Sequence, residues 1–106
     1  MAIQELEIQD IEGIYAGETF SRKVELRIDE ELQDLSAYTL AVDIYTLSSS
    51  TTPRWTSAAD AITADNSTIV IPASITEGML GYYIIKVTFN IGGFITIRKA
   101  KFKVEI

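Results

Sequence analysis

Two residue types that carry much of protein chemistry are missing from this chain of 106 residues, which has no cysteine and no histidine. The missing cysteine excludes disulfide bonds and thiolate nucleophiles. The missing histidine excludes imidazole bases and haem ligation by histidine, and both absences together exclude the usual Cys/His zinc sites. An enzyme built on this sequence would need a carboxylate or a lysine with a strongly shifted pKa as its base.

Long apolar runs and recognisable catalytic motifs are missing as well. No window approaches 18 uninterrupted apolar residues, so we expect no membrane-spanning segment. The first residues show no basic segment followed by an apolar run, so no signal peptide is predicted. Because the chain also has no glycine-rich phosphate loop and no serine in a nucleophile elbow, we predict no catalytic, cofactor-binding or metal-binding residues.

Positive charge is scarce and unevenly placed. Nine basic against fifteen acidic residues give a net charge of −6, which disfavours binding to nucleic acid or to an anionic membrane. Residues 1–34 contain ten acids and three bases, whereas residues 86–106 contain five bases and a single acid. Two interpretations remain open. Either two solvated faces attract each other within the fold, or the acidic end of one copy meets the basic end of another.

Apolar and polar residues alternate with a period of two along most of the chain, which is typical of strands with one buried face. The clearest run is Phe20–Asp29, and a paired-glycine hairpin at Asn90–Gly93 separates the last two runs. We therefore predict a single all-β domain over residues 1–106. It is expected to be a two-sheet antiparallel immunoglobulin-like sandwich of about seven strands, with a small barrel as the alternative. Residues 1–12 form either an N-terminal arm or an edge strand.

Two local features depart from simple alternation. The last run changes phase between Ile95-x-Ile97 and Phe102-x-Val104, and a β-bulge near Arg98–Ala100 would reconcile the two halves. Ala58–Ala64 could form a helical turn. Ser74–Gly78 is also expected to form one, with Ser74 as its cap.

Acidic and aromatic clusters are the remaining candidates for binding. The carboxylates of Asp29–Asp34 could hold a calcium ion, but their spacing departs from an EF-hand loop and a solvated turn is the preferred interpretation. The aromatic residues could form a sugar- or protein-binding platform. We predict instead that Trp55 and Tyr83 belong to the core, and that Tyr38 and Tyr45 lie near or on an outward face.

Several short motifs, taken in order, resemble those of a known family. They are Gly17–Phe20 at a strand start, Asp34–Ser36 before a strand ending Val42–Tyr45, Gly81–Tyr83 before a glycine hairpin, and Ala100–Val104 at the end. This order resembles small immunoglobulin-like domains of tailed-phage and prophage structural proteins, such as the N-terminal domain of baseplate upper proteins. The acidic first twelve residues and the Ser/Thr-rich segment 46–53 have no counterpart in it.

The resemblance implies a non-enzymatic virion structural or assembly protein without cofactors. Such a protein acts in the host cytoplasm during assembly and then in the virion. Its partners are further copies of itself, as a homo-oligomer, and other virion structural proteins, with no nucleic acid and no membrane involved. Independently of the resemblance, the short first strand could pair with a neighbouring subunit's sheet edge. The predicted interface residues are Leu6, Ile8, Tyr38, Tyr45, Arg98, Lys99, Lys101 and Lys103.

Two other functions fit the sequence. A fibronectin-like module could bind a cell-surface protein or a carbohydrate, and it would need an exposed aromatic patch involving Tyr38, Tyr45 or Trp55. The chain could also act as a domain inside a larger cytoplasmic complex.

Overall fold

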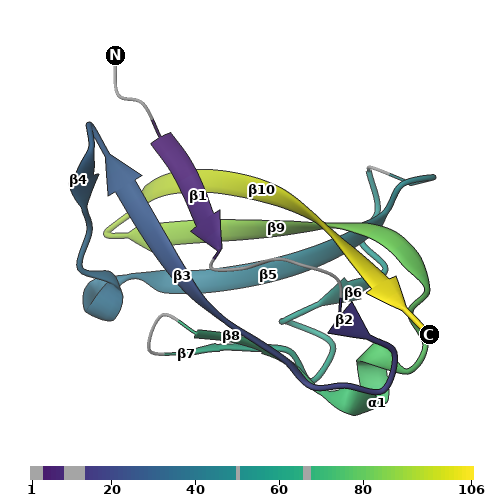
Figure 1. Cartoon of the computed structure of the whole chain (residues 1–106). Helices are drawn as coiled ribbons and strands as arrows, with labels where there is room; N and C mark the ends of the chain where they lie inside the picture. Colours follow the sequence, from purple (N-terminus) through teal and green to yellow (C-terminus); the bar gives the residue numbers. More distant parts are fainter. Residues whose placement is uncertain (1–3, 9–13, 50, 66–67) are drawn as a thin grey trace.

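Two β-sheets of five strands each form the protein (Figure 1). The computed structural model describes residues 4–8, 14–49, 51–65 and 68–106, and of residues 4–8 and 65 it describes the backbone. Besides the strands, these residues form one turn of 3-10 helix, η1 (Leu35–Ala37), and the short helix α1 (Ala73–Thr76). The predicted all-β two-sheet sandwich is therefore confirmed against the alternative of a small barrel.

The first sheet has the strand order β1-β3-β8-β7, and the short β4 pairs with one end of β3. The edge strand β1 lies antiparallel to β3 over five residue pairs, so the first strand belongs to the sheet of its own chain. In Figure 1, β1 and β3 run diagonally in front of the second sheet. The strands of the first sheet are β1 (Gln4–Ile8), β3 (Phe20–Ile28), β4 (Glu31–Leu32), β7 (Thr63–Asp65) and β8 (Thr68–Ile71).

The second sheet has the order β2-β10-β9-β5-β6. Its pairings are antiparallel except that of β2, which runs parallel to the end of β10 and departs from the predicted pattern. Its strands are β2 (Ile14–Tyr15), β5 (Thr39–Thr46), β6 (Trp55–Thr56), β9 (Gly81–Ile91) and β10 (Phe94–Glu105). Of the ten segments in the described residues, β2, β4 and β6 have two residues each, which leaves seven longer strands.

Alternating side chains from both sheets meet between them and form the core, as the period-two pattern predicts. The largest fully buried side chains are Phe20, Phe89, Leu26, Ile44, Ile69, Ile71, Met79, Ile85, Val24, Val42, Val87 and Val104. Aromatic rings link the layers. The ring centres of Phe20 (β3) and Phe102 (β10) lie 5.5 Å apart. The ring centre of Tyr83 lies 5.8 Å from that of Phe102 and 5.8 Å from that of Trp55. Trp55 and Tyr83 are core residues, as predicted.

Strand β10 is continuous, and the predicted bulge near Arg98–Ala100 is wrong. It pairs with β9 over eleven consecutive residue pairs without the shift of register that a bulge produces. The turn at Gly92–Gly93 closes this hairpin as predicted, with φ values of 55° and 88° that favour glycine. Because the register is unbroken, Ile95 and Ile97 lie on the outer face, where they are 57% and 46% exposed.

Helical structure departs from the prediction in two places. Ala58–Ala64 forms a turn and the start of β7 instead of a helical turn, and Ile62 within it is buried. Helix α1 overlaps the predicted segment Ser74–Gly78, but it begins at Ala73, and its N-cap is Pro72 rather than Ser74. None of the helices in the described residues is long and apolar enough to cross a membrane.

The β3–β4 hairpin has a two-residue turn formed by acidic residues. Asp29 and Glu30 have φ values of 53° and 66°, a region that few residues other than glycine adopt. Ile28 pairs with Glu31 directly across this turn. The predicted acidic loop is thus a tight hairpin that projects from one end of the sandwich (Figure 1).

Tyr83 fixes the connection into β9. Its hydroxyl accepts a hydrogen bond from the Leu80 N–H at 2.8 Å and donates one to the Leu80 carbonyl at 3.3 Å. The ring is 7% exposed and packs into the aromatic chain described above. The phenol therefore attaches the start of a central strand to the core.

We expect Tyr83→Phe to lower the free energy of unfolding by about 1 kcal/mol, because both hydrogen bonds to Leu80 are lost while the ring is kept. Urea denaturation followed by the fluorescence of Trp55 measures this. Tyr82→Phe is the matched control, since its neighbouring ring is 48% exposed, and it should change the value by less than about 0.5 kcal/mol. An equal loss in the two variants would contradict the proposed role of Tyr83.

Candidate interaction surface

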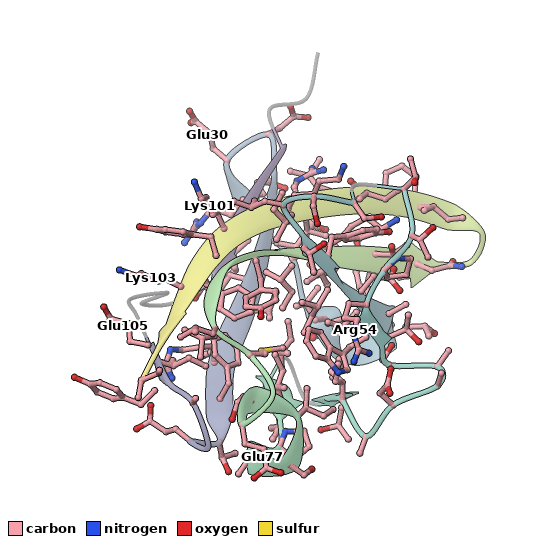
Figure 2. The ribbon with its side chains drawn as sticks, turned by 90° about the vertical axis from the view of Figure 1, so that its right-hand side faces the viewer. Glu30, Arg54, Glu77, Lys101, Lys103 and Glu105 are labelled. Atoms are coloured by element: carbon pink, nitrogen blue, oxygen red, sulfur yellow. The ribbon has the colours of Figure 1, made fainter. Side chains whose placement is uncertain are left out.

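The outer face of β9 and β10 gathers four of the protein's five lysines. It carries a set that we call the lysine face, made up of Lys86, Lys99, Lys101 and Lys103. Odd-numbered residues of β10 point outward because the even-numbered ones fill the core. Figure 2 shows the side chains of Lys101 and Lys103 extending to the same side, away from the sheet. The β9–β10 register, and not the sequence spacing alone, places these four lysines together.

Two of these lysines lie directly opposite each other. Lys99 of β10 pairs in register with Lys86 of β9, and like charges at opposite positions destabilise a sheet. The side chain of Lys86 extends away from Lys99 and toward β5, where its Nζ lies 3.9 Å from Asp43 and 5.5 Å from the centre of the Tyr45 ring. Lys99 is exposed and forms no ion pair with any described residue. Its charge is therefore available to a partner.

Tyr82 lies between the other two lysines of the face. The Nζ atoms of Lys101 and Lys103 lie 4.7 and 5.5 Å from its ring centre, and Lys103 also pairs with Glu105 at 3.3 Å. The alternation pattern places Tyr82 outward, but only the register shows that it stands opposite Lys103. It was not among the predicted interface residues.

Exposed apolar side chains continue this surface toward the β9–β10 turn. Ile95 and Ile97, which lie on the same face as the lysines, are 57% and 46% exposed. The predicted bulge implied a change of face within β10, so Ile95 and Ile97 were not predicted to be exposed beside the lysines. A cluster of large apolar side chains beside charged ones is typical of a protein-binding surface.

Of the predicted aromatic interface residues, neither is a free outward side chain. Tyr45 lies on the outward face of β5, as predicted, but it is only 8% exposed, because the Lys86 side chain covers its ring. Tyr38 is half-buried and packs against the core, and its hydroxyl lies 3.5 Å from the Gln33 side chain. Trp55 is 9% exposed, and the Arg54 guanidinium lies 4.6 Å from the centre of its ring.

The predicted interface residues of the first strand, Leu6 and Ile8, lie in β1 and pair with β3. In β1, Leu6 pairs with Leu26 and Ile8 with Val24, within the sheet of the same chain. The side chains of Leu6 and Ile8 lie outside the described part of the structure. Because β1 is the edge strand of its sheet, pairing with a neighbouring subunit would use the edge that faces away from β3.

Arg98 differs from the predicted interface lysines because it lies on the inner side of β10. Its Nη1 donates a 2.6 Å hydrogen bond to the Ile97 carbonyl, while Nε and Nη2 are buried and have no acceptor among the described residues. Burial lowers the pKa of the guanidinium from its ordinary value. Arg98 was predicted as an interface residue, and the unbroken register places it on the inner side of β10, because even positions point inward.

Arg98 lies at an open sheet edge. Among the described residues, β2 covers only Val104 and Glu105 of β10, so the stretch from Phe94 to Lys103 has β9 on one side alone. Inward-pointing charges and exposed lysines on an edge strand deter pairing with other chains. The β10 edge is therefore protected, and its outer face is the better docking surface.

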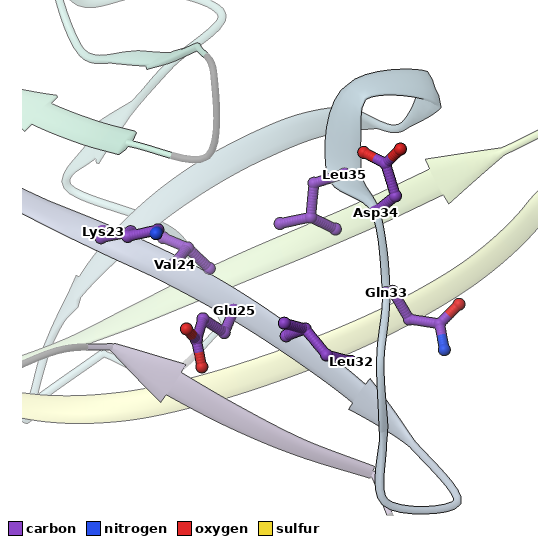
Figure 3. A pocket seen from close by; sticks show the side chains of 7 residues that line it. All are labelled: Lys23, Val24, Glu25, Leu32, Gln33, Asp34 and Leu35. Atoms are coloured by element: carbon purple, nitrogen blue, oxygen red, sulfur yellow. The ribbon is translucent and has the colours of Figure 1, made fainter.

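A small pocket of about 190 Å³ lies between β3 and the segment after β4 (Figure 3). Typical small-molecule sites enclose about 300–1,000 Å³. The side chains of Gln33 and Asp34 in Figure 3 point away from Lys23 and Glu25 on the opposite wall. A hydrogen bond from the Ser36 backbone N–H lowers the pKa of the Asp34 carboxyl, so Asp34 serves as the cap of η1. Nothing in this geometry favours catalysis.

The acidic turn does not gather ligands for a metal. In the part of the chain that the structure describes, no three carboxylates are placed to hold a metal ion together. Asp29, Glu30, Glu31 and Asp34 are instead exposed along the hairpin.

The chain matches no protein-family model and no curated protein. What it does must therefore be inferred from its own residues, above all from the lysine face.

We expect Arg98→Leu to raise the free energy of unfolding by about 1 kcal/mol, because it removes two buried nitrogen donors, Nε and Nη2, for which the described residues provide no acceptor. The same variant should precipitate at a lower protein concentration, since the β10 edge loses its inward charge. Urea denaturation and light scattering against concentration measure the two effects. Arg98→Lys, which keeps a charge, should remain soluble. A destabilised Arg98→Leu protein with unchanged solubility would contradict this account of the edge.

Proposed function

We propose that the protein is a non-enzymatic structural module that works by docking onto other proteins, including further copies of itself. One observation carries the proposal. A chain with a net charge of −6 places four lysines on one sheet face beside the two exposed side chains of Ile95 and Ile97. Complementary charge steers association and fixes its geometry, and apolar contact adds affinity. The cross-strand pair Lys86–Lys99 would gain from a negatively charged partner.

We infer further that the sandwich is immunoglobulin-like. The order β1-β3-β8-β7 matches strands A-B-E-D of that fold, and β10-β9-β5 matches G-F-C. The hydroxyl of Tyr83 at the start of β9 bonds back to the backbone of Leu80, in the manner of the tyrosine corner of that fold. Domains of this kind serve many functions, so the fold alone selects none of them.

The setting that we propose is a tailed phage or prophage, where the protein is a virion structural or assembly component. This rests on the resemblance of its short motifs to those of baseplate-type immunoglobulin-like domains. On this proposal the protein works in the host cytoplasm during assembly and then in the virion, with other virion structural proteins as partners. A charged, apolar docking face on a small module supports such a role.

The alternative of a fibronectin-like module that binds a cell surface is less well supported. It requires an exposed aromatic patch at Tyr38, Tyr45 or Trp55, and these three side chains are buried or half-buried. The exposed ring of Tyr82 is flanked by two lysines, which suits an acidic protein surface better than a neutral sugar.

We expect the protein to form oligomers in about 10 mM salt and to dissociate toward its monomer mass of 11.8 kDa in about 1 M salt. The reason is that the screening length falls from about 30 Å to about 3 Å between these conditions. Size-exclusion chromatography with light scattering measures the mass directly. A mass of one chain at both salt concentrations, at high protein concentration, would contradict docking between copies.

A further inference from the structure

We propose that the lysine face of one copy binds the β3–β4 hairpin of a second copy. The hairpin segment is Asp29–Asp34, which we call the acidic hairpin, and its sequence DEELQD has four acids and no base. This inference rests on the docking function proposed above and names the partner surface for it. The proposed contact joins two different surfaces, one from each copy.

The lysine face cannot bind to its own counterpart. Two such faces in contact would bring the lysines of both copies together, and like-charge contacts in an interface are unfavourable. The second copy must therefore present a negatively charged surface. The acidic hairpin is the place where described carboxylates are most closely spaced along the chain.

The acidic hairpin is shaped and charged for such a contact. Its turn is tight, with positive φ at Asp29 and Glu30, and pairing of β4 with β3 holds it away from the rest of the chain. Asp29, Glu30 and Glu31 are exposed and form no ion pair with any described residue. In Figure 2, Glu30 projects beyond the body of the sandwich. The carboxylates are thus available to a second molecule.

Apolar contacts would accompany the charge pairs. Leu32, inside the acidic hairpin, is 55% exposed, and the lysine face continues into exposed Ile95 and Ile97. Leu32 could therefore contact the two isoleucines while the carboxylates around it contact the lysines. Charge pairs alone at an exposed surface contribute little, so the apolar part is needed for a stable contact.

The two surfaces belong to different sheets of one molecule. The acidic hairpin extends from β3 and β4 of the first sheet, and the lysine face lies on β9 and β10 of the second. Each copy can then use its hairpin toward one neighbour and its lysine face toward another. Contacts between two different surfaces are heterologous, and they generate rings where the rotation closes and filaments where it does not.

Charge reversal on either surface tests the proposal. We expect Lys101→Glu and Glu31→Lys each to raise the dissociation constant of self-association at least about ten-fold at low salt. The matched control is Glu77→Lys beside α1, which reverses an exposed charge away from both surfaces and should associate like the wild type. Sedimentation equilibrium measures the constants. The fluorescence of Trp55 checks that each variant is folded.

A mixture of the two variants gives a sharper result. The Lys101→Glu protein keeps the native acidic hairpin, and the Glu31→Lys protein keeps the native lysine face. Mixing them restores one native contact, so we expect complexes that neither variant forms alone. Association of both variants at wild-type strength would overturn this inference while leaving docking between copies intact. A wild type that stays monomeric at low salt would overturn both.

Discussion

The pairing of β9 with β10 is the constraint on which the rest of the surface depends. Side chains alternate between the two faces of a strand, so a shift of one residue would exchange the faces completely. Phe102 and Val104 would then leave the core, and the lysines of the lysine face on β10 would enter it. The turn at Gly92–Gly93 fixes the register that prevents this. Core packing and surface charge therefore have the same origin in this protein.

Strand β10 disfavours association through its backbone edge and favours association through the side chains of its outer face. The edge of β10 carries the inward-pointing Arg98 and alternating lysines, which deter backbone pairing between sheets. Its outer face presents those lysines together with exposed isoleucines. Association through side chains is specific, because it needs matching charges, whereas backbone pairing accepts almost any strand. The docking function that we propose needs both properties, because it requires specific association without aggregation.

Much of the fold could be predicted from the sequence, because period-two alternation directly encodes which face of each strand is buried. The sandwich, the glycine hairpin and the core positions of Trp55 and Tyr83 follow from it. Local sequence patterns gave wrong predictions where contacts between residues far apart in the sequence determine which side chains are buried. Tyr45 is buried by Lys86 from a neighbouring strand, and the change of phase in β10 reflects unusual inner residues such as Arg98 rather than a bulge. The opposition of Lys86 and Lys99 likewise depends on a register that spacing alone does not give.

The most direct measurement is zero-length carbodiimide cross-linking, which joins a lysine amine to a carboxylate only when the two are in contact. A mixture of unlabelled and isotope-labelled protein separates links between copies from links within one copy. We expect mixed-isotope links between the lysine face and Glu30 or Glu31 at low salt, and their loss at high salt. Links between copies that involve other carboxylates, with none from the acidic hairpin, would contradict this account.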